Sequence, residues 1–122
     1  ELGEQQLNGN YLTNAPKVSI NLGLNYTTAM ESGASLTYRA NAAYKSRIYF
    51  SEFNEYSQDA YTIVDLNLIW ESADETMRSR FFIKNATDED YISGYLSSAT
   101  GGGRFGQWGY PRTAGIEIQR NF

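Results

Sequence analysis

The 122-residue sequence contains no cysteine and no histidine, and it contains only 2 prolines. Without cysteine, the chain can form no disulfide framework and offers no thiol nucleophile. Without histidine, it offers no imidazole base and no usual zinc site. These absences exclude many classes of catalytic site. We expect a protein that is not an enzyme, with no cofactor and with no catalytic or metal-binding residues.

The sequence also lacks an excess of basic residues and any long apolar run. Its 10 Lys and Arg residues are outnumbered by 14 Asp and Glu residues, and the formal net charge is −4. Nucleic-acid binding needs a basic face, so we expect no nucleic-acid partner. No segment approaches the roughly 18 consecutive apolar residues of a membrane-spanning helix. Membrane-spanning strands are not excluded, because they place apolar residues only at alternate positions.

What the sequence does contain is a period-two alternation of apolar and polar side chains, which indicates β-strands. The alternation runs through 16–30, 34–50, 61–70, 78–85 and 112–122. These stretches are longer than the usual strand of about five or six residues. All but the fourth, which is the shortest, are long enough to cross a bilayer. We predict an all-β fold, an antiparallel transmembrane β-barrel segment of about five long strands. In the first four strands the positions expected to face lipid are Val18, Ile20, Leu22, Leu24, Tyr26, Leu36, Tyr38, Val64, Leu66, Leu68, Trp70, Phe81 and Ile83.

The connections alternate between short and long. Short turns at 31–33 and 71–77 alternate with long loops at 51–60 and 87–111. Antiparallel strands place all the short turns at one edge of the sheet, an asymmetry typical of outer-membrane barrels with periplasmic turns and extracellular loops. We also expect an interfacial aromatic girdle at a single level near the short turns, formed by Tyr26, Tyr38, Trp70, Phe81 and Phe122.

Four segments of the chain resemble the C-terminal part of a TonB-dependent outer-membrane receptor. They are NAPKVSINLGLNY (14–26), YTIVDLNLIW (61–70), FFIKNATDEDY (81–91) and PRTAGIEIQRNF (111–122). The resemblance rests on their order and spacing together with the terminal Phe122. It implies that residues 1–15 are the remnant of an extracellular loop and that residues 16–122 are the last strands of a larger barrel of about 22 strands with a plugged lumen.

The resemblance also implies a function, a location and a set of partners. The whole protein would be a receptor of the bacterial cell outer membrane that imports a scarce, bulky nutrient such as a metal-chelate, cobalamin or an oligosaccharide. Its partners would be the remaining barrel strands and the plug domain, the TonB system and the barrel-insertion machinery. Lipid and lipopolysaccharide would surround it, and a surface lipoprotein is a further possible partner. Five strands alone cannot close such a barrel, and their open edges need pairing.

Two groups of residues are candidate functional sites. The terminal strand resembles the signal that the insertion machinery reads, through Gly115, Ile116, Ile118 and Phe122. The glycine-rich loop offers aromatic faces and a cation suited to a sugar or an aromatic chelate, through Tyr95, Arg104, Phe105 and Trp108. The alternative, which we favour for the loop, is that its aromatic residues pack the loop on itself or anchor it in lipopolysaccharide.

Other motifs and readings are weaker. GGGRFG (101–106) matches a dinucleotide fingerprint, but the helix that such a site needs does not follow it. The carboxylates of 88–90 suit Ca²⁺ in type, yet a solvated charge run explains them better.

Two alternatives to the receptor remain open. One is a self-assembling short outer-membrane barrel or adhesin, and the other is a soluble β-sandwich binding module, which would seal its apolar faces into a core.

Overall fold

The computed structural model describes residues 6–97 and 103–122, except for the side chains of Ser97 and Arg104. The chain divides into two compact units. We call the first the strand unit, made of Ile20–Ala43, Thr62–Asp90 and Tyr110–Phe122, and the second the hairpin unit, made of Glu1–Ser19, Tyr44–Tyr61 and Tyr91–Gly109. In the described part of the chain, no helix has the length and apolarity needed to span a membrane.

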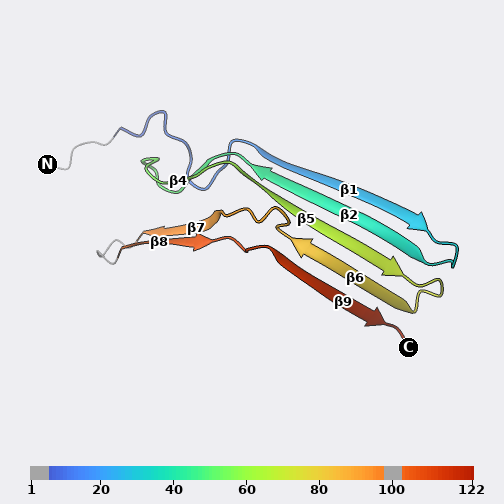
Figure 1. The fold of residues 1–122 in the computed structure, drawn as a ribbon. Coiled ribbons are helices and arrows are strands. Elements are labelled where there is room, and N and C mark those ends of the chain that lie inside the picture. Colours follow the sequence, from blue (N-terminus) through green and yellow to red (C-terminus); the bar gives the residue numbers. More distant parts are fainter. Residues whose placement is uncertain (1–5, 98–102) are drawn as a thin grey trace. The chain divides into compact units, whose positions relative to one another are not determined.

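The strand unit is built on one five-stranded antiparallel sheet (Figure 1). Consecutive long strands lie side by side, and the order is β1-β2-β5-β6-β9. The expectation of an all-β, antiparallel fold with about five long strands is therefore confirmed. The outer strands, β1 and β9, each have one edge without a partner strand in the described residues. The strands are β1 (Ser19–Ala29), β2 (Ser35–Lys45), β5 (Tyr61–Glu71), β6 (Met77–Lys84) and β9 (Thr113–Arg120).

Two tight turns join the strands of this sheet. Between β1 and β2, the amide of Met30 donates to the carbonyl of Ala34 at 2.8 Å, and Gly33 takes a φ of 83° that favours glycine. Between β5 and β6, the carboxylate of Asp74 accepts hydrogen bonds from the hydroxyl of Ser72 at 2.6 Å and from the hydroxyl of Thr76 at 2.9 Å. The Ser72 hydroxyl first, and then Thr76, hold the pKa of Asp74 below its usual value.

One face of the sheet is apolar and exposed. Leu22 is 67% exposed, Leu24 76% and Ile118 71%. The register places Leu66 opposite Ile83 and Leu68 opposite Phe81, so apolar residues of neighbouring strands adjoin on this face. All positions expected to face lipid in the strand unit are exposed or only partly buried. No compact core seals them in the described residues.

The predicted aromatic girdle is wrong at Phe81, which does not lie at the level of Trp70. Strand register pairs Trp70 with Ser79 and pairs Phe81 with Leu68. Phe81 therefore lies two residues further from the turn than Trp70 does. The alternation fixes only the face on which a side chain lies, whereas its level depends on the register that the turn imposes. Tyr26 and Tyr38 do adjoin, with ring centroids 6.3 Å apart.

The opposite face of the sheet is charged, but it holds an unexpected apolar cluster. Arg80 and Glu117 form an ion pair at 2.5 Å across β6 and β9. Beside Arg80 in the register lies Ile69, which is only 5% exposed. The ring of Phe82 lies over Gly115, its partner in register, where a Cβ atom would come within 2.5 Å of the ring. Arg80 contacts this ring from one side at 5.1 Å.

A buried asparagine secures the chain as it leaves β6. Asn85 is 2% exposed and has a positive φ of 49°. Its side-chain amide donates to the carbonyls of Glu89 at 2.9 Å and of Tyr110 at 3.1 Å, and its side-chain oxygen accepts from the Glu89 amide at 2.9 Å. One side chain thereby closes the turn that follows β6 and attaches it to the segment that leads into β9.

The hairpin unit contains short strands, most of which the alternation pattern did not indicate; the exception, Ile48–Tyr49, lies within the predicted strand at 34–50. A short ladder joins β3 (Ile48–Tyr49) to β4 (Ser57–Gln58), and a hairpin joins β7 (Ile92–Ser97) to β8 (Arg104–Trp108). The second pair lies within 87–111, for which the sequence predicted only loop. Glycines hide the pattern there, because they supply no side chain to alternate. Gly109 is required for packing, since a Cβ atom would lie 2.1 Å from the ring of Tyr91.

Candidate functional site

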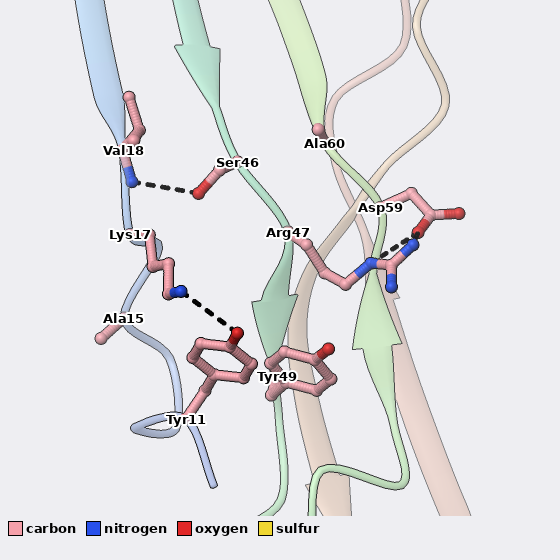
Figure 2. A pocket seen from close by; sticks show the side chains of 9 residues that line it. All are labelled: Tyr11, Ala15, Lys17, Val18, Ser46, Arg47, Tyr49, Asp59 and Ala60. Carbon is pink, nitrogen blue, oxygen red and sulfur yellow. Dashed lines mark hydrogen bonds and ion pairs between the residues drawn. The ribbon is translucent and has the colours of Figure 1, made fainter. Parts of the chain in front are cut away.

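One hollow of the hairpin unit has a volume of about 640 Å³, and we call it the tyrosine hollow. Figure 2 shows its lining side chains, which come from the segment before β1 and from the segments around β3 and β4. The lining is mainly apolar, with charged groups on two sides. The residues that line it are Tyr11, Ala15, Lys17, Val18, Ser46, Arg47, Tyr49, Asp59 and Ala60.

Two parallel tyrosine rings form one wall of the tyrosine hollow. The rings of Tyr11 and Tyr49 stack with centroids 5.2 Å apart and planes 3° from parallel. The ammonium of Lys17 donates to the Tyr11 hydroxyl at 3.1 Å and lies 4.4 Å from the centroid of the same ring (Figure 2). This wall offers flat aromatic surface beside a cation that is already hydrogen-bonded.

The second charged group of the tyrosine hollow is an exposed ion pair. The guanidinium of Arg47 lies 2.7 Å from the carboxylate of Asp59, and its Nε donates to the same carboxylate at 3.0 Å. The hydrogen bond with Tyr49, followed by that with Asp59, raises the pKa of Arg47. The Val18 amide donates to the Ser46 hydroxyl at 3.0 Å, which fixes the two segments relative to each other. Both cations of this hollow therefore already have partners within the chain.

A second hollow of the hairpin unit, of about 480 Å³, differs in charge, and we call it the acidic hollow. Its aromatic part is a stack of three rings. Tyr95 stacks on Phe50 with centroids 5.8 Å apart and on Tyr56 with centroids 5.2 Å apart. Two glutamates are the charged residues among those that the structure describes in its lining. The residues that line it are Thr13, Phe50, Ser51, Glu52, Phe53, Glu55, Tyr56 and Tyr95.

The loop that carries the two glutamates is held in place by Asn54. This residue adopts a φ of 55°, and its side-chain oxygen accepts a hydrogen bond from the amide of Tyr11 at 2.7 Å. Its side-chain nitrogen donates to the carbonyls of Tyr11 at 3.1 Å and of Ser51 at 3.2 Å. The amide of Phe50 also donates to the carbonyl of Tyr56 at 2.8 Å, which closes the loop at its base.

The structure separates the four ligand-binding candidates. Tyr95 belongs to the ring stack of the acidic hollow. Phe105 and Trp108 lie on β8 and are 60% and 69% exposed, and no described ring contact joins either to Tyr95. The side chain of Arg104 lies outside the described part of the structure. The four residues stay a hypothesis as a set, and Tyr95 is the member that lines a described hollow.

The assembly-signal candidates all belong to the end of the chain. Ile116 and Ile118 are exposed on the apolar face of the edge strand β9, and Phe122 is fully exposed. Gly115 is different, because it adjoins the ring of Phe82 on the charged face. A packing role therefore accounts for Gly115 beside the predicted assembly role.

Asp88, the first carboxylate of the acidic run at 88–90, is engaged within the chain. The carboxylate of Asp88 accepts a hydrogen bond from the Arg112 amide at 3.1 Å and pairs with the Arg112 guanidinium at 3.3 Å. Among the described residues, no group of three or more His, Cys, Asp or Glu side chains is placed to hold a metal ion.

Sequence reasoning missed most of the residues that line the two hollows. The segment IYFSEFNEY (48–56) interleaves aromatic and acidic residues. That composition was the available signal for the acidic hollow. Tyr11 and Lys17 carry no comparable local pattern. The ring on which Tyr11 stacks, that of Tyr49, lies more than 25 residues further along the chain, and so does the ion pair of Arg47 that lines the same hollow.

No protein-family model matches the chain. In structure, it is similar to the ferric yersiniabactin uptake receptor FyuA from Yersinia pestis, with a TM-score of 0.83 and 22% sequence identity. The match covers 95% of this chain and 18% of that receptor chain. The chain thus spans less than a fifth of the length of the receptor that it matches. At this identity the likeness shows a common fold, that of a segment of an uptake receptor.

Proposed function

We propose that the chain forms part of the barrel wall of a receptor of the bacterial outer membrane, one that takes up a scarce, bulky nutrient. The single observation that carries this proposal is the sheet with one apolar, exposed face and one charged face. Leu22, Leu66 and Ile118 on the apolar face are 67%, 40% and 71% exposed. Leaving so much apolar surface in water is unfavourable, whereas hydrocarbon accommodates it.

The two open edges of the sheet favour completion by further strands. The outer edges of β1 and β9 lack a partner strand in the described residues. Unpaired backbone groups cannot be solvated in hydrocarbon, so both edges need partners inside a membrane. The structural likeness to a segment of an uptake receptor supports strands of the same protein as those partners.

The finer parts of the proposal follow from the family resemblance. Energy would reach the receptor through TonB, a plug domain would fill the lumen, and the insertion machinery would read β9 and Phe122. The charged face, with Arg80 and Glu117, would line the lumen against the plug. Metal-chelates, cobalamin and oligosaccharides all remain candidate nutrients, and a surface lipoprotein remains a candidate partner. The proposed role involves no enzymatic reaction.

A pair of arginine substitutions in neighbouring residues of β1 tests the proposed function. Leu22→Arg places a charge on the apolar face, and Asn21→Arg, the matched control, places it on the opposite face. A lipid-facing arginine costs about 2–4 kcal/mol near the bilayer midplane. In the complete protein expressed in cells, Leu22→Arg should lower the amount of heat-modifiable protein recovered in outer membranes, and Asn21→Arg should not.

Two outcomes would contradict the proposal. Equal recovery of the two variants would mean that the apolar face does not contact lipid. Recovery of the wild-type protein in the soluble fraction would favour the β-sandwich module instead. Co-purification of tagged and untagged copies would point to the self-assembling barrel, because separate copies would then supply the missing edges.

A further inference from the structure

The acidic hollow of the hairpin unit carries polar groups that have no partner in the described part of the chain. The hydroxyl of Tyr95 is buried and makes no hydrogen bond there. The carboxylates of Glu52 and Glu55 border the hollow, and neither joins an ion pair among the described residues. In the tyrosine hollow, by contrast, Lys17 and Arg47 are both partnered. The acidic hollow is therefore the better candidate for a ligand.

The charge of this hollow selects the sign of its ligand. Among the residues whose side chains the structure describes, two glutamates line it and no lysine or arginine does. An anionic group would meet repulsion from both carboxylates, whereas a cation would be attracted by both. Phe53 adds to this preference, since its ring is 42% exposed and aromatic faces attract cations.

The hollow is also preformed. Asn54 fixes the loop between Ser51 and Tyr56 through its hydrogen bonds to Tyr11 and Ser51, and the rings of Phe50, Tyr95 and Tyr56 form a continuous stack. A site that is ordered before the ligand arrives loses less conformational entropy on binding. Its volume of about 480 Å³ lies within the range of small-molecule sites.

We propose that the acidic hollow binds an alkylammonium group of the transported nutrient. This inference rests on the proposed function, because it assigns the hollow to the nutrient of an uptake receptor. The ammonium lies against the exposed ring of Phe53, between the carboxylates of Glu52 and Glu55.

The test uses choline and its uncharged isostere 3,3-dimethylbutan-1-ol as probes. Both are titrated against the complete protein in detergent, and binding is followed by saturation-transfer NMR of the probe methyl groups. Choline should bind at least about threefold more tightly than the isostere, since the two differ only in charge. The double variant Glu52→Gln/Glu55→Gln should weaken choline binding at least about threefold and leave the isostere unchanged.

The matched control is Glu31→Gln, which removes a carboxylate from the exposed turn between β1 and β2. It should leave choline binding unchanged. Equal affinity for the two probes, binding of neither, or equal weakening by Glu31→Gln would each overturn the inference. These results would leave the proposed function unaffected. That function is tested separately by the recovery of Leu22→Arg and Asn21→Arg in outer membranes.

Discussion

The contact between Gly115 and Phe82 gives a prediction that separates packing from assembly. A Cβ atom at Gly115 would lie 2.5 Å from Cζ of Phe82, with a second ring carbon at 2.9 Å. The ring must therefore move in Gly115→Ala. Overpacking of this kind costs about 1–3 kcal/mol. Alanine regains about 0.5–1 kcal/mol relative to glycine in a strand. The expected net loss of unfolding free energy is about 0–2.5 kcal/mol.

The second half of the experiment removes the ring. The Phe82→Ala background removes the three atoms nearest to the new methyl group, so Gly115→Ala should become neutral or slightly stabilising. The double-mutant cycle should therefore show a coupling energy of at least about 1 kcal/mol. Unfolding in urea, followed in detergent with the complete protein, measures all four variants, and the yield in outer membranes is recorded alongside.

The result that would refute this reasoning is specific. Gly115→Ala would lower the yield in outer membranes without changing the unfolding free energy, and Phe82→Ala would not restore that yield. Gly115 would then act as part of the signal that the insertion machinery reads, as the sequence suggests, and its contact with Phe82 would be incidental.

Three further predictions concern the strand and hairpin units. Asn85→Ala should cost about 2–4 kcal/mol, because three hydrogen bonds and a tolerated positive φ are lost, and Asn85→Gly should cost less in the same urea unfolding assay. The pKa of Asp74 is lowered in the folded state, so its contribution to stability is present above about pH 4 and is lost as the pH falls through the folded pKa. Asp74→Asn should therefore destabilise at pH 7, and the destabilisation should shrink as the pH falls below about 4; an effect that stays constant with pH would refute this. Arg47→Gln should leave the unfolding free energy nearly unchanged, because its ion pair with Asp59 is exposed to water.

The long strands could be predicted from the sequence because alternation is local. Val18 to Tyr26 and Val64 to Trp70 show their faces within a few residues, and no distant contact is needed to assign them. The distance of each side chain from the turn, and so its level across the sheet, could not be predicted in the same way. The placement of Phe81 opposite Leu68 depends on the register set by the turn at Asp74.

The two hollows could not be predicted because they depend on contacts between distant segments. Tyr95 meets Phe50 and Tyr56 only when β7 returns beside the segment of β3 and β4. Ile69 and Phe82 were overlooked for a different reason. They are apolar residues on the charged face, and alternation alone assigns such positions to polar surroundings.

The central claim is that every second side chain of these strands contacts lipid, and site-specific quenching tests it most directly. The chain has no cysteine, so single cysteines at Leu24 and Ile116, and at the neighbouring Asn25 and Glu117, give the only labels within it. Each is labelled with an environment-sensitive fluorophore in the complete protein, reconstituted in vesicles of ordinary or brominated lipid. Brominated lipid should quench the labels at Leu24 and Ile116 strongly and those at Asn25 and Glu117 weakly. Equal quenching at neighbouring positions would contradict the account.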